Sequence, residues 1–180
     1  WVHEVEKYCR ECLFLEQRKW PTLLRSLIGF LKGQALSIPY YANQEMTSWV
    51  KSTVHEHNIR NAMVYCSSMA QHVLDIRDGF ERKVVDFVDV DSDKWRQYAD
   101  RQHWPISWLY RRESRRLLEY ESKLAEAFDA GLFVSASEAE LFRRLSPSTA
   151  SKIGFYNNGV NSSYFKPCHR RDNPYPRGIL

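Results

Sequence analysis

Two aspartates separated by one residue follow an apolar, β-branched run near the middle of the chain. The run is residues 84–88, and the acids are Asp89 and Asp91. Side chains two apart at a strand end point to the same side. Neighbouring carboxylates are costly unless they meet a cation, a hydrogen-bond donor or a substrate hydroxyl. We therefore expect a catalytic role for at least one of the two.

Three chemistries could use this pair. The aspartates could bind a divalent metal on a nucleotide-sugar diphosphate. Asp89 could instead be a phosphorylated nucleophile with Asp91 as acid/base, as in haloacid-dehalogenase-like phosphatases, although no later acidic pair follows a strand. The acids could also orient or deprotonate an acceptor hydroxyl. A structural alternative is that one acid caps the next helix, in competition with Ser92 or Asp93.

The elements that must position these acids follow from hydrophobic periodicity. Short apolar runs predict strands over residues 12–15, 62–66, 84–88, 131–134 and 152–156. Helices are expected over residues 44–57, 68–74, about 104–130, and 137–145. Nearly continuous hydrophobicity suits strands covered on both faces, and strand–helix alternation is typical of a doubly wound sheet. We predict an α/β, Rossmann-like fold with a parallel sheet and helices on both faces.

Ligands in such a sheet bind outside the carboxyl ends of the strands. The candidate ligand-binding residues at these ends are Ser67, Ser68, Ser92, Ser135, Glu138, Asn158 and Gly159. Ser67 and Ser68 could bind a sugar or phosphate oxygen, but a serine there is more often an ordinary helix cap. Asn158-Gly159 suggests a tight turn with positive φ.

Composition excludes several classes of protein. The chain has 180 residues, 43% of them hydrophobic and 27% charged, with a net charge of +4. This mildly basic, globular composition does not indicate a nucleic-acid-binding protein. Cys9 and Cys12 have a metal-like spacing, but a structural zinc site needs a second pair. We expect no metal site.

The long helix predicted over residues 104–130 carries a partly basic face with Arg112, Arg115 and Arg116. That face could lie on anionic lipid or reach for a phosphate. Glu119 and Glu126 dilute its charge, which favours a solvated face on a packed helix.

Several motifs together resemble the retaining glycosyltransferases of family four. Residues 158–161 (NGVN) and 164–167 (YFKP) are similar to that family's N-G-V-D…F-x-P phrase, with Asn161 in place of the usual Asp. Residues 134–140 resemble its V-S-E-A-E element. Four further segments resemble a bacterial exopolysaccharide branch of this family that is associated with exosortase systems. They are residues 36–41, 67–71, 85–95 and 110–113.

The resemblance implies the N-terminal half of a GT-B fold and a hexosyltransferase activity in cell-surface polysaccharide synthesis. It implies a nucleotide-sugar donor, a glycan or lipid-linked acceptor and no obligatory metal or other cofactor. Many members have a His-Asp pair at the strand end occupied here by residues 89–92, and its role is transferred to Asp89 or Asp91. The expected location is cytoplasmic, with peripheral contact at the inner face of the plasma membrane.

The domain assignment follows from the same resemblance. We expect residues 1–165 to be a partial acceptor-side domain and residues 166–180 to be a linker that leads to the donor-binding domain. We interpret the chain as a fragment, inactive by itself. The alternatives are a non-catalytic glycan- or nucleotide-binding module, and the Asp-x-Asp phosphatase.

Overall fold

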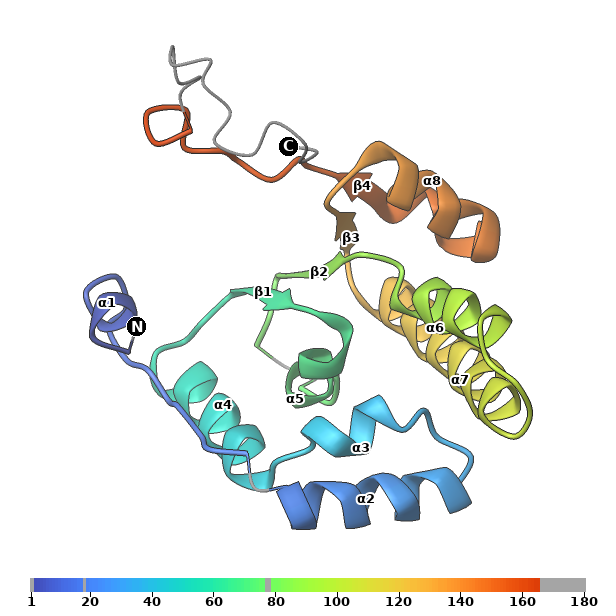
Figure 1. The fold of residues 1–180 in the computed structure, drawn as a ribbon. Coiled ribbons are helices and arrows are strands. Elements are labelled where there is room, and N and C mark those ends of the chain that lie inside the picture. Colours follow the sequence, from blue (N-terminus) through green and yellow to red (C-terminus); the bar gives the residue numbers. More distant parts are fainter. Residues whose placement is uncertain (1, 18, 77–78, 166–180) are drawn as a thin grey trace, which may run out of the picture.

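The computed structural model describes residues 2–17, 19–76 and 79–165 (Figure 1). Four α-helices precede the first strand: α1 (Val2–Glu6), α2 (Lys19–Leu31), α3 (Ser37–Tyr41) and α4 (Gln44–Glu56). The remaining elements are β1 (Asn61–Tyr65), the short 3-10 helix η1 (Ser67–Ala70), α5 (Gln71–Leu74), β2 (Arg82–Val88), α6 (Asp91–Asp100), α7 (Ile106–Ala127), β3 (Ala130–Phe133), α8 (Ala136–Leu145), η2 (Pro147–Lys152) and β4 (Ile153–Phe155).

The four strands form one parallel sheet in the order β1-β2-β3-β4. One row of paired residues runs across it from Val64 to Val85, Gly131 and Ile153. The predicted α/β class, with a parallel sheet flanked by helices, is confirmed. The strands predicted within residues 62–66, 84–88, 131–134 and 152–156 are present with shifted ends.

The strand expected over residues 12–15 is wrong. These residues have no regular secondary structure. A strand needs the backbone of a neighbour to pair with, and β1, at the edge of the sheet, pairs only with β2. The nearby Gln17 side chain instead donates a hydrogen bond to the backbone oxygen of Tyr40 at 2.9 Å. An apolar run alone therefore did not distinguish a strand from a packed loop.

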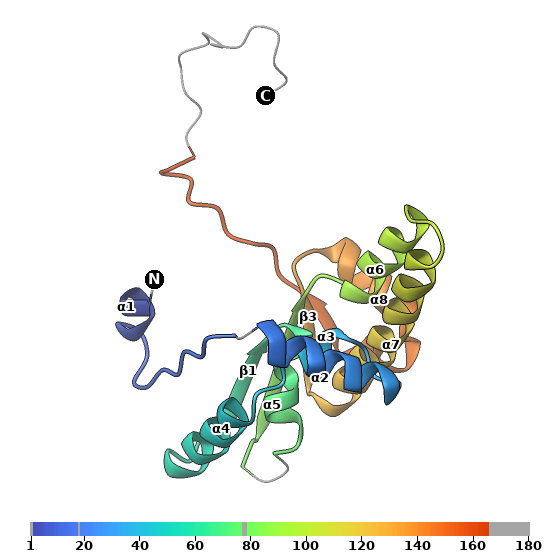
Figure 2. The same ribbon diagram turned by 60° about the horizontal axis from the view of Figure 1, so that its bottom comes forward.

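The hydrophobic core lies between the sheet and the helices α5, α7 and α8. Phe87 of β2 stacks on Phe133 of β3 and Phe142 of α8, with ring centroids 5.1 and 5.4 Å away. Because crossovers between parallel strands are right-handed, strands laid down in sequential order place their connecting helices on one face. Figures 1 and 2 show α5, α7 and α8 on that common side.

The opposite face of the sheet is more open. Met63 and Tyr65 of β1 point there, and they are 64% and 68% exposed. Coverage of the two faces is therefore unequal.

None of the helices among the described residues is both long enough and apolar enough to cross a bilayer. The linker expected over residues 166–180 lies outside the described residues.

Gly131 provides a test of this packing. A Cβ built at Gly131 would lie 2.9 Å from both the Ile153 Cδ1 and the Phe87 Cε2 atoms. Because Phe87 is fixed between two other rings, we expect Gly131→Ala to lower the free energy of unfolding by about 1–3 kcal/mol, as overpacking typically does. Urea unfolding monitored by circular dichroism measures this.

Gly159→Ala is the matched control, since a Cβ built there has no neighbour within 4 Å. Its unfolding midpoint should equal that of the wild type. If both variants were equally stable, the aromatic cluster would be looser than described.

Candidate active site

The predicted site residues follow strands whose carboxyl ends meet at one edge of the sheet. Ser67 follows β1, Asp89 follows β2 and Ser135 follows β3. Backbone hydrogen bonds join these ends: Cys66 N donates to Asp86 O, and Val134 N donates to Val88 O, both at 2.8 Å. Asp89, Ser67 and Ser135 therefore share an edge, as predicted from the topology. Their roles in binding or catalysis stay predictions.

Two adjacent strand ends leave the sheet through unusual backbone conformations. Cys66 after β1 has φ +66°, and Val88 at the end of β2 has φ +70°. At Val88 the chain makes a tight three-residue turn in which Asp89 N donates to Phe87 O at 2.9 Å. A β-branched residue in this region is a true outlier. Such strain clusters at ligand-binding and catalytic sites.

Lys94 lies between the two aspartates. Its ammonium donates to Asp89 Oδ2 at 2.7 Å and to Asp91 Oδ1 at 3.2 Å. The side chains of Asp89, Asp91 and Lys94 are 33%, 38% and 44% exposed. Partial burial lowers the pKa of Lys94, but the hydrogen bonds and charges of both aspartates outweigh burial, so its pKa is raised. Lys94 is the cation that makes the carboxylate pair tolerable.

Glu121 of α7 lies beneath this loop and is 1% exposed. Its carboxyl group accepts hydrogen bonds from Ser92 Oγ at 2.6 Å and from Ser92 N at 3.3 Å. Burial raises the pKa of Glu121 to about 8; hydrogen bonds from Ser92 and the charge of Lys94 oppose the shift, whereas Asp91 adds to it. The predicted ligand contact Ser92 is itself buried, so its hydroxyl holds the loop rather than facing a surface ligand.

The N-terminus of α6 is therefore held by other helices. No side chain of its own loop caps it. Glu138 of α8 accepts a hydrogen bond from Val90 N at 2.7 Å, next to the bonds from Ser92 to Glu121. The expectation that an aspartate, Ser92 or Asp93 caps this helix is wrong, because two distant glutamates already fill that position.

The other predicted ligand-binding residues lie in different environments. Ser67 and Ser68 are buried in η1, and Ser67 Oγ has no hydrogen-bond partner among the described residues. Ser135 caps α8, accepting a hydrogen bond from Glu138 N at 3.2 Å.

Asn158 and Gly159 are exposed in the segment after β4, which leaves the body of the domain in Figure 2. The tight positive-φ turn expected there is wrong, since among the described residues neither of the two is left-handed. A turn forms just beyond, where Asn161 Oδ1 accepts from Ser163 N and Tyr164 N.

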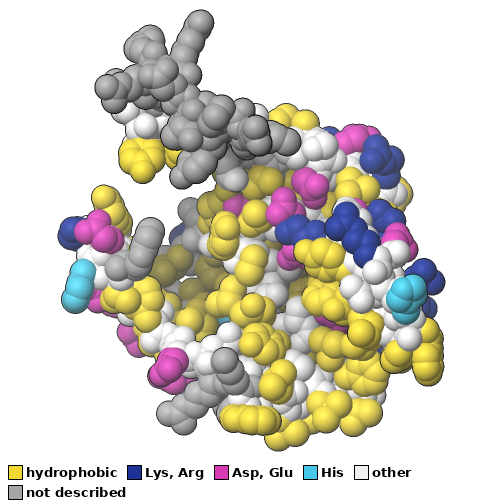
Figure 3. Space-filling model, viewed as in Figure 1, with side chains coloured by type: hydrophobic (Ala, Val, Ile, Leu, Met, Phe, Trp, Pro, Cys, Tyr) yellow, Lys and Arg dark blue, Asp and Glu magenta, His cyan; other side chains and the backbone are white. Residues whose placement is uncertain are grey.

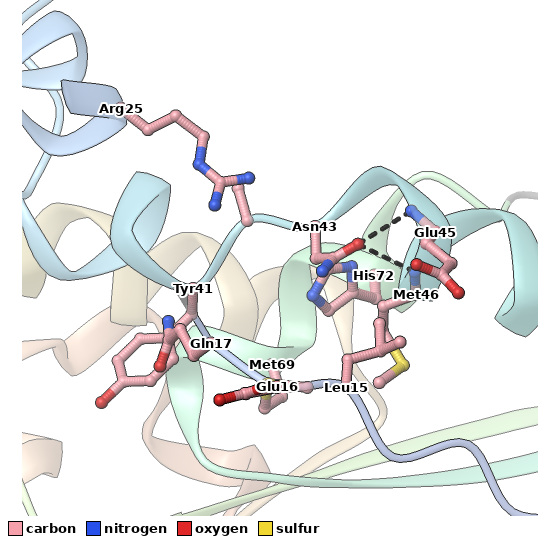
Figure 4. Close-up of a pocket in the computed structure, with 11 residues that line it drawn as sticks. Leu15, Glu16, Gln17, Arg25, Tyr41, Asn43, Glu45, Met46, Met69 and His72 are labelled. Atoms are coloured by element: carbon pink, nitrogen blue, oxygen red, sulfur yellow. Dashed lines mark hydrogen bonds between the residues drawn. The ribbon is translucent and has the colours of Figure 1, made fainter. Parts of the chain in front are cut away.

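A polar cavity of about 450 Å³ borders the η1–α5 segment that follows β1. Figure 4 shows the guanidinium of Arg25 reaching towards it from α2, with His72 and Asn43 across from it. The Arg25 Nε and His72 Nε2 atoms are buried, and neither has a hydrogen-bond partner among the described residues. Protein encloses both atoms, and the cavity is also lined by Glu16 and Glu45, so charged groups of both signs border it.

His72 is neutral in this cavity. Burial lowers its pKa, and a hydrogen bond involving the Tyr41 backbone opposes the shift without reversing it. The other ring nitrogen, Nδ1, lies 2.7 Å from Thr47 Oγ1 of α4. With carboxylates, amides, an imidazole and a guanidinium around it, the cavity suits a ligand that both donates and accepts hydrogen bonds, such as a sugar.

No family model matches the chain, and neither does any curated protein or any solved structure. Within the described ranges, no group of three or more His, Cys, Asp or Glu side chains could hold a metal ion. Cys9 and Cys12 are free thiols.

Sequence reasoning missed Glu121 and the Arg25–His72 cavity. A signal for Glu121 was present, because residues 113, 117, 121 and 124 recur at helical spacing and the leucines at 117 and 124 are core residues. An acid on that stripe must be buried, and a buried acid needs partners. The cavity had no comparable signal, because its walls come from segments far apart in the chain.

The raised pKa of Glu121 predicts a pH dependence of stability. The folded protein holds this proton more tightly than the unfolded chain, so the contribution is complete below pH of about 4.5 and is lost as pH rises through about 8. Within that window the free energy of unfolding should fall by up to about 1.4 kcal/mol per pH unit. Glu121→Gln, neutral throughout, should remove this slope in urea titrations from pH 5 to 9.

Glu119→Gln serves as the control, because Glu119 lies on the same helix but is exposed and pairs with Arg116. It should keep the wild-type slope. An unchanged slope in Glu121→Gln would mean that Glu121 is ionised in the folded protein.

Proposed function

We propose that this chain is the acceptor-side part of a nucleotide-sugar-dependent glycosyltransferase that acts in cell-surface polysaccharide synthesis. The observation that carries the proposal is the pair Asp89 and Asp91, held by Lys94 at the carboxyl edge of a parallel sheet. The motifs that resemble the family-four enzymes supply the reaction class. Under this proposal the enzyme works in the cytoplasm, at the inner face of the plasma membrane.

The pair suits a role towards an acceptor hydroxyl. Both carboxylates are partly exposed, so each can accept a hydrogen bond from a substrate while remaining in contact with Lys94. A carboxylate that accepts this hydrogen bond orients the hydroxyl group. It can also accept the proton that the hydroxyl group loses during the reaction. Lys94, protonated at neutral pH, keeps the two acids from repelling each other and presents a positive charge beside the reacting groups.

The cavity between Arg25 and His72 supports the acceptor side of the proposal. It borders η1, which follows β1 next to the strand that precedes Asp89. Its volume of about 450 Å³ is in the range of small-molecule sites. Its carboxylate, amide and guanidinium groups can accept hydrogen bonds from hydroxyl groups and donate to them. The donor is then bound by a second α/β domain outside residues 1–180.

No observation favours the phosphatase. Asp91 begins α6 and is tied with Asp89 to one lysine, and the described part of the chain offers no carboxylate cluster for a metal. A binding module without chemistry would share this geometry, so turnover separates the two.

Turnover by the complete protein tests the pair. Asp89→Asn or Asp91→Asn should lower kcat by about 10²–10⁴-fold, the usual contribution of general acid–base catalysis. Both changes keep the shape of the side chain, so the melting temperature should change little. Release of nucleoside diphosphate from a panel of UDP- and GDP-sugars, with lipid-linked glycan acceptors, is the measurement.

Asp100→Asn is the matched control, because Asp100 is an exposed acid of the same helix that pairs with Arg96. Its turnover should be that of the wild type. If the aspartate variants had a lower melting temperature but the wild-type kcat, Asp89 and Asp91 would have only a structural role. Wild-type activity abolished by a chelator and restored by manganese would instead favour a metal-dependent Asp-x-Asp site.

A further inference from the structure

Helix α2 presents its apolar residues to solvent. The exposed side chains recur every three or four residues and so form one stripe along the helix. They are Trp20, Leu23, Leu24, Leu27, Ile28 and Leu31. Trp20 is 84% exposed and Leu31 is 79% exposed. In most globular proteins such a stripe faces the core.

The inward side of α2 carries small and polar residues instead. Thr22 and Ser26 are buried, and Ser26 Oγ donates to Leu36 O at 3.1 Å. Gly29 is also buried, and a Cβ there would collide with Pro39 of α3. The helix is therefore docked on the domain by its polar side, which leaves the apolar stripe free.

The apolar surface continues onto the start of α7. Phe30 of α2 contacts the ring of Trp108 at a centroid distance of 6.3 Å, and Trp104, Ile106 and Trp108 are exposed. Figure 3 shows hydrophobic side chains gathered over α2 at the lower side of the molecule. We call these nine exposed residues, six of α2 with Trp104, Ile106 and Trp108, the α2 surface. An apolar groove of about 510 Å³, lined by Leu23, Leu27 and Leu109, opens beside it.

The charges of the segments that carry the α2 surface have one sign. Residues 17–44 contain Arg18, Lys19, Arg25 and Lys32 and no Asp or Glu. Residues 101–112 contain Arg101, Arg111 and Arg112, again without an acid. Acids lie just outside both segments: Asp100 pairs with Arg111 at 3.7 Å, and Glu16 and Glu45 line a cavity with Arg25. The segments themselves are basic. Anionic lipid headgroups would complement that charge.

We propose that the α2 surface docks the protein on an anionic bilayer, with α2 lying in the plane of the interface. A helix with Trp and Leu along one side, whose own charged residues are all basic, is the pattern of interfacial helices. The groove beside α2 extends the apolar area that lipid chains can cover. This docking assigns a surface to the membrane location in the proposed function and rests on that part of it, but it does not depend on which reaction the protein performs.

Co-sedimentation with vesicles tests the docking. The protein should bind vesicles of phosphatidylcholine with about 30% phosphatidylglycerol and bind pure phosphatidylcholine much less. Raising the salt from about 0.05 M to about 0.5 M should weaken binding, since screening shortens the reach of charges. Brominated lipid should quench the wild-type tryptophan fluorescence more than that of Trp20→Phe, if α2 enters the interface.

Leu24→Asp/Leu31→Asp should lower the partition coefficient at least about tenfold. Both residues are exposed, so circular dichroism should be unchanged. Val160→Asp/Phe165→Asp is the matched control, adding the same charge at apolar positions that are equally exposed, and it should bind like the wild type. Equal binding by all three proteins would overturn the proposal. The proposal would also be overturned if the wild type did not bind vesicles but self-associated, and if Leu24→Asp/Leu31→Asp abolished that self-association.

Discussion

Two glutamates buried in the core-facing stripe of α7 hold the rest of the structure in place. Glu113 accepts hydrogen bonds from Leu36 N at 2.7 Å and from Ser37 N at 3.1 Å, at the start of α3. Glu121 accepts from Ser92 at the start of α6. Each carboxyl group satisfies amides that a helix N-terminus leaves unpaired, and each is buried at the cost of its own hydration. A single helix thereby fixes two distant segments.

Each of these two contacts supports one of the two surfaces to which we assign a function. Through Ser92, Glu121 sets the height of the loop that carries Asp89 and Asp91 above the sheet. Through α3, Glu113 sets the position of the α2–α3 pair, and with it the apolar stripe of α2. Because α7 is one continuous helix of 22 residues, a single element positions both the carboxylate pair and the α2 surface.

Local pattern was enough to predict the sheet, and with it the edge at which Asp89 lies. Strands such as 84–88 are recognised by nearly continuous apolar residues, interrupted here only by Asp86, which is a property of the segment itself. The roles of Ser92 and Glu121 depend on a pairing 29 residues apart in the sequence, which no local pattern contains. Glu121 was also hidden by its type, because a charged residue on a helix is expected to face water. Helix α2 was not predicted from the sequence, and an apolar stripe like the one it carries would be expected to face inward.

The conformation of Val88 has a consequence for how the protein can evolve. A left-handed backbone costs a β-branched residue about 1–2 kcal/mol relative to glycine, and hydrogen bonds from Val88 N to Asp86 Oδ1 and from Val134 N to Val88 O hold it there. Glycine would adopt this turn without strain, but it would also make the backbone at the turn more flexible. Selection at this position therefore weighs thermal stability against a fixed direction of the backbone that leads into Asp89. Heat-adapted and cold-adapted versions of the protein would be expected to resolve that conflict differently.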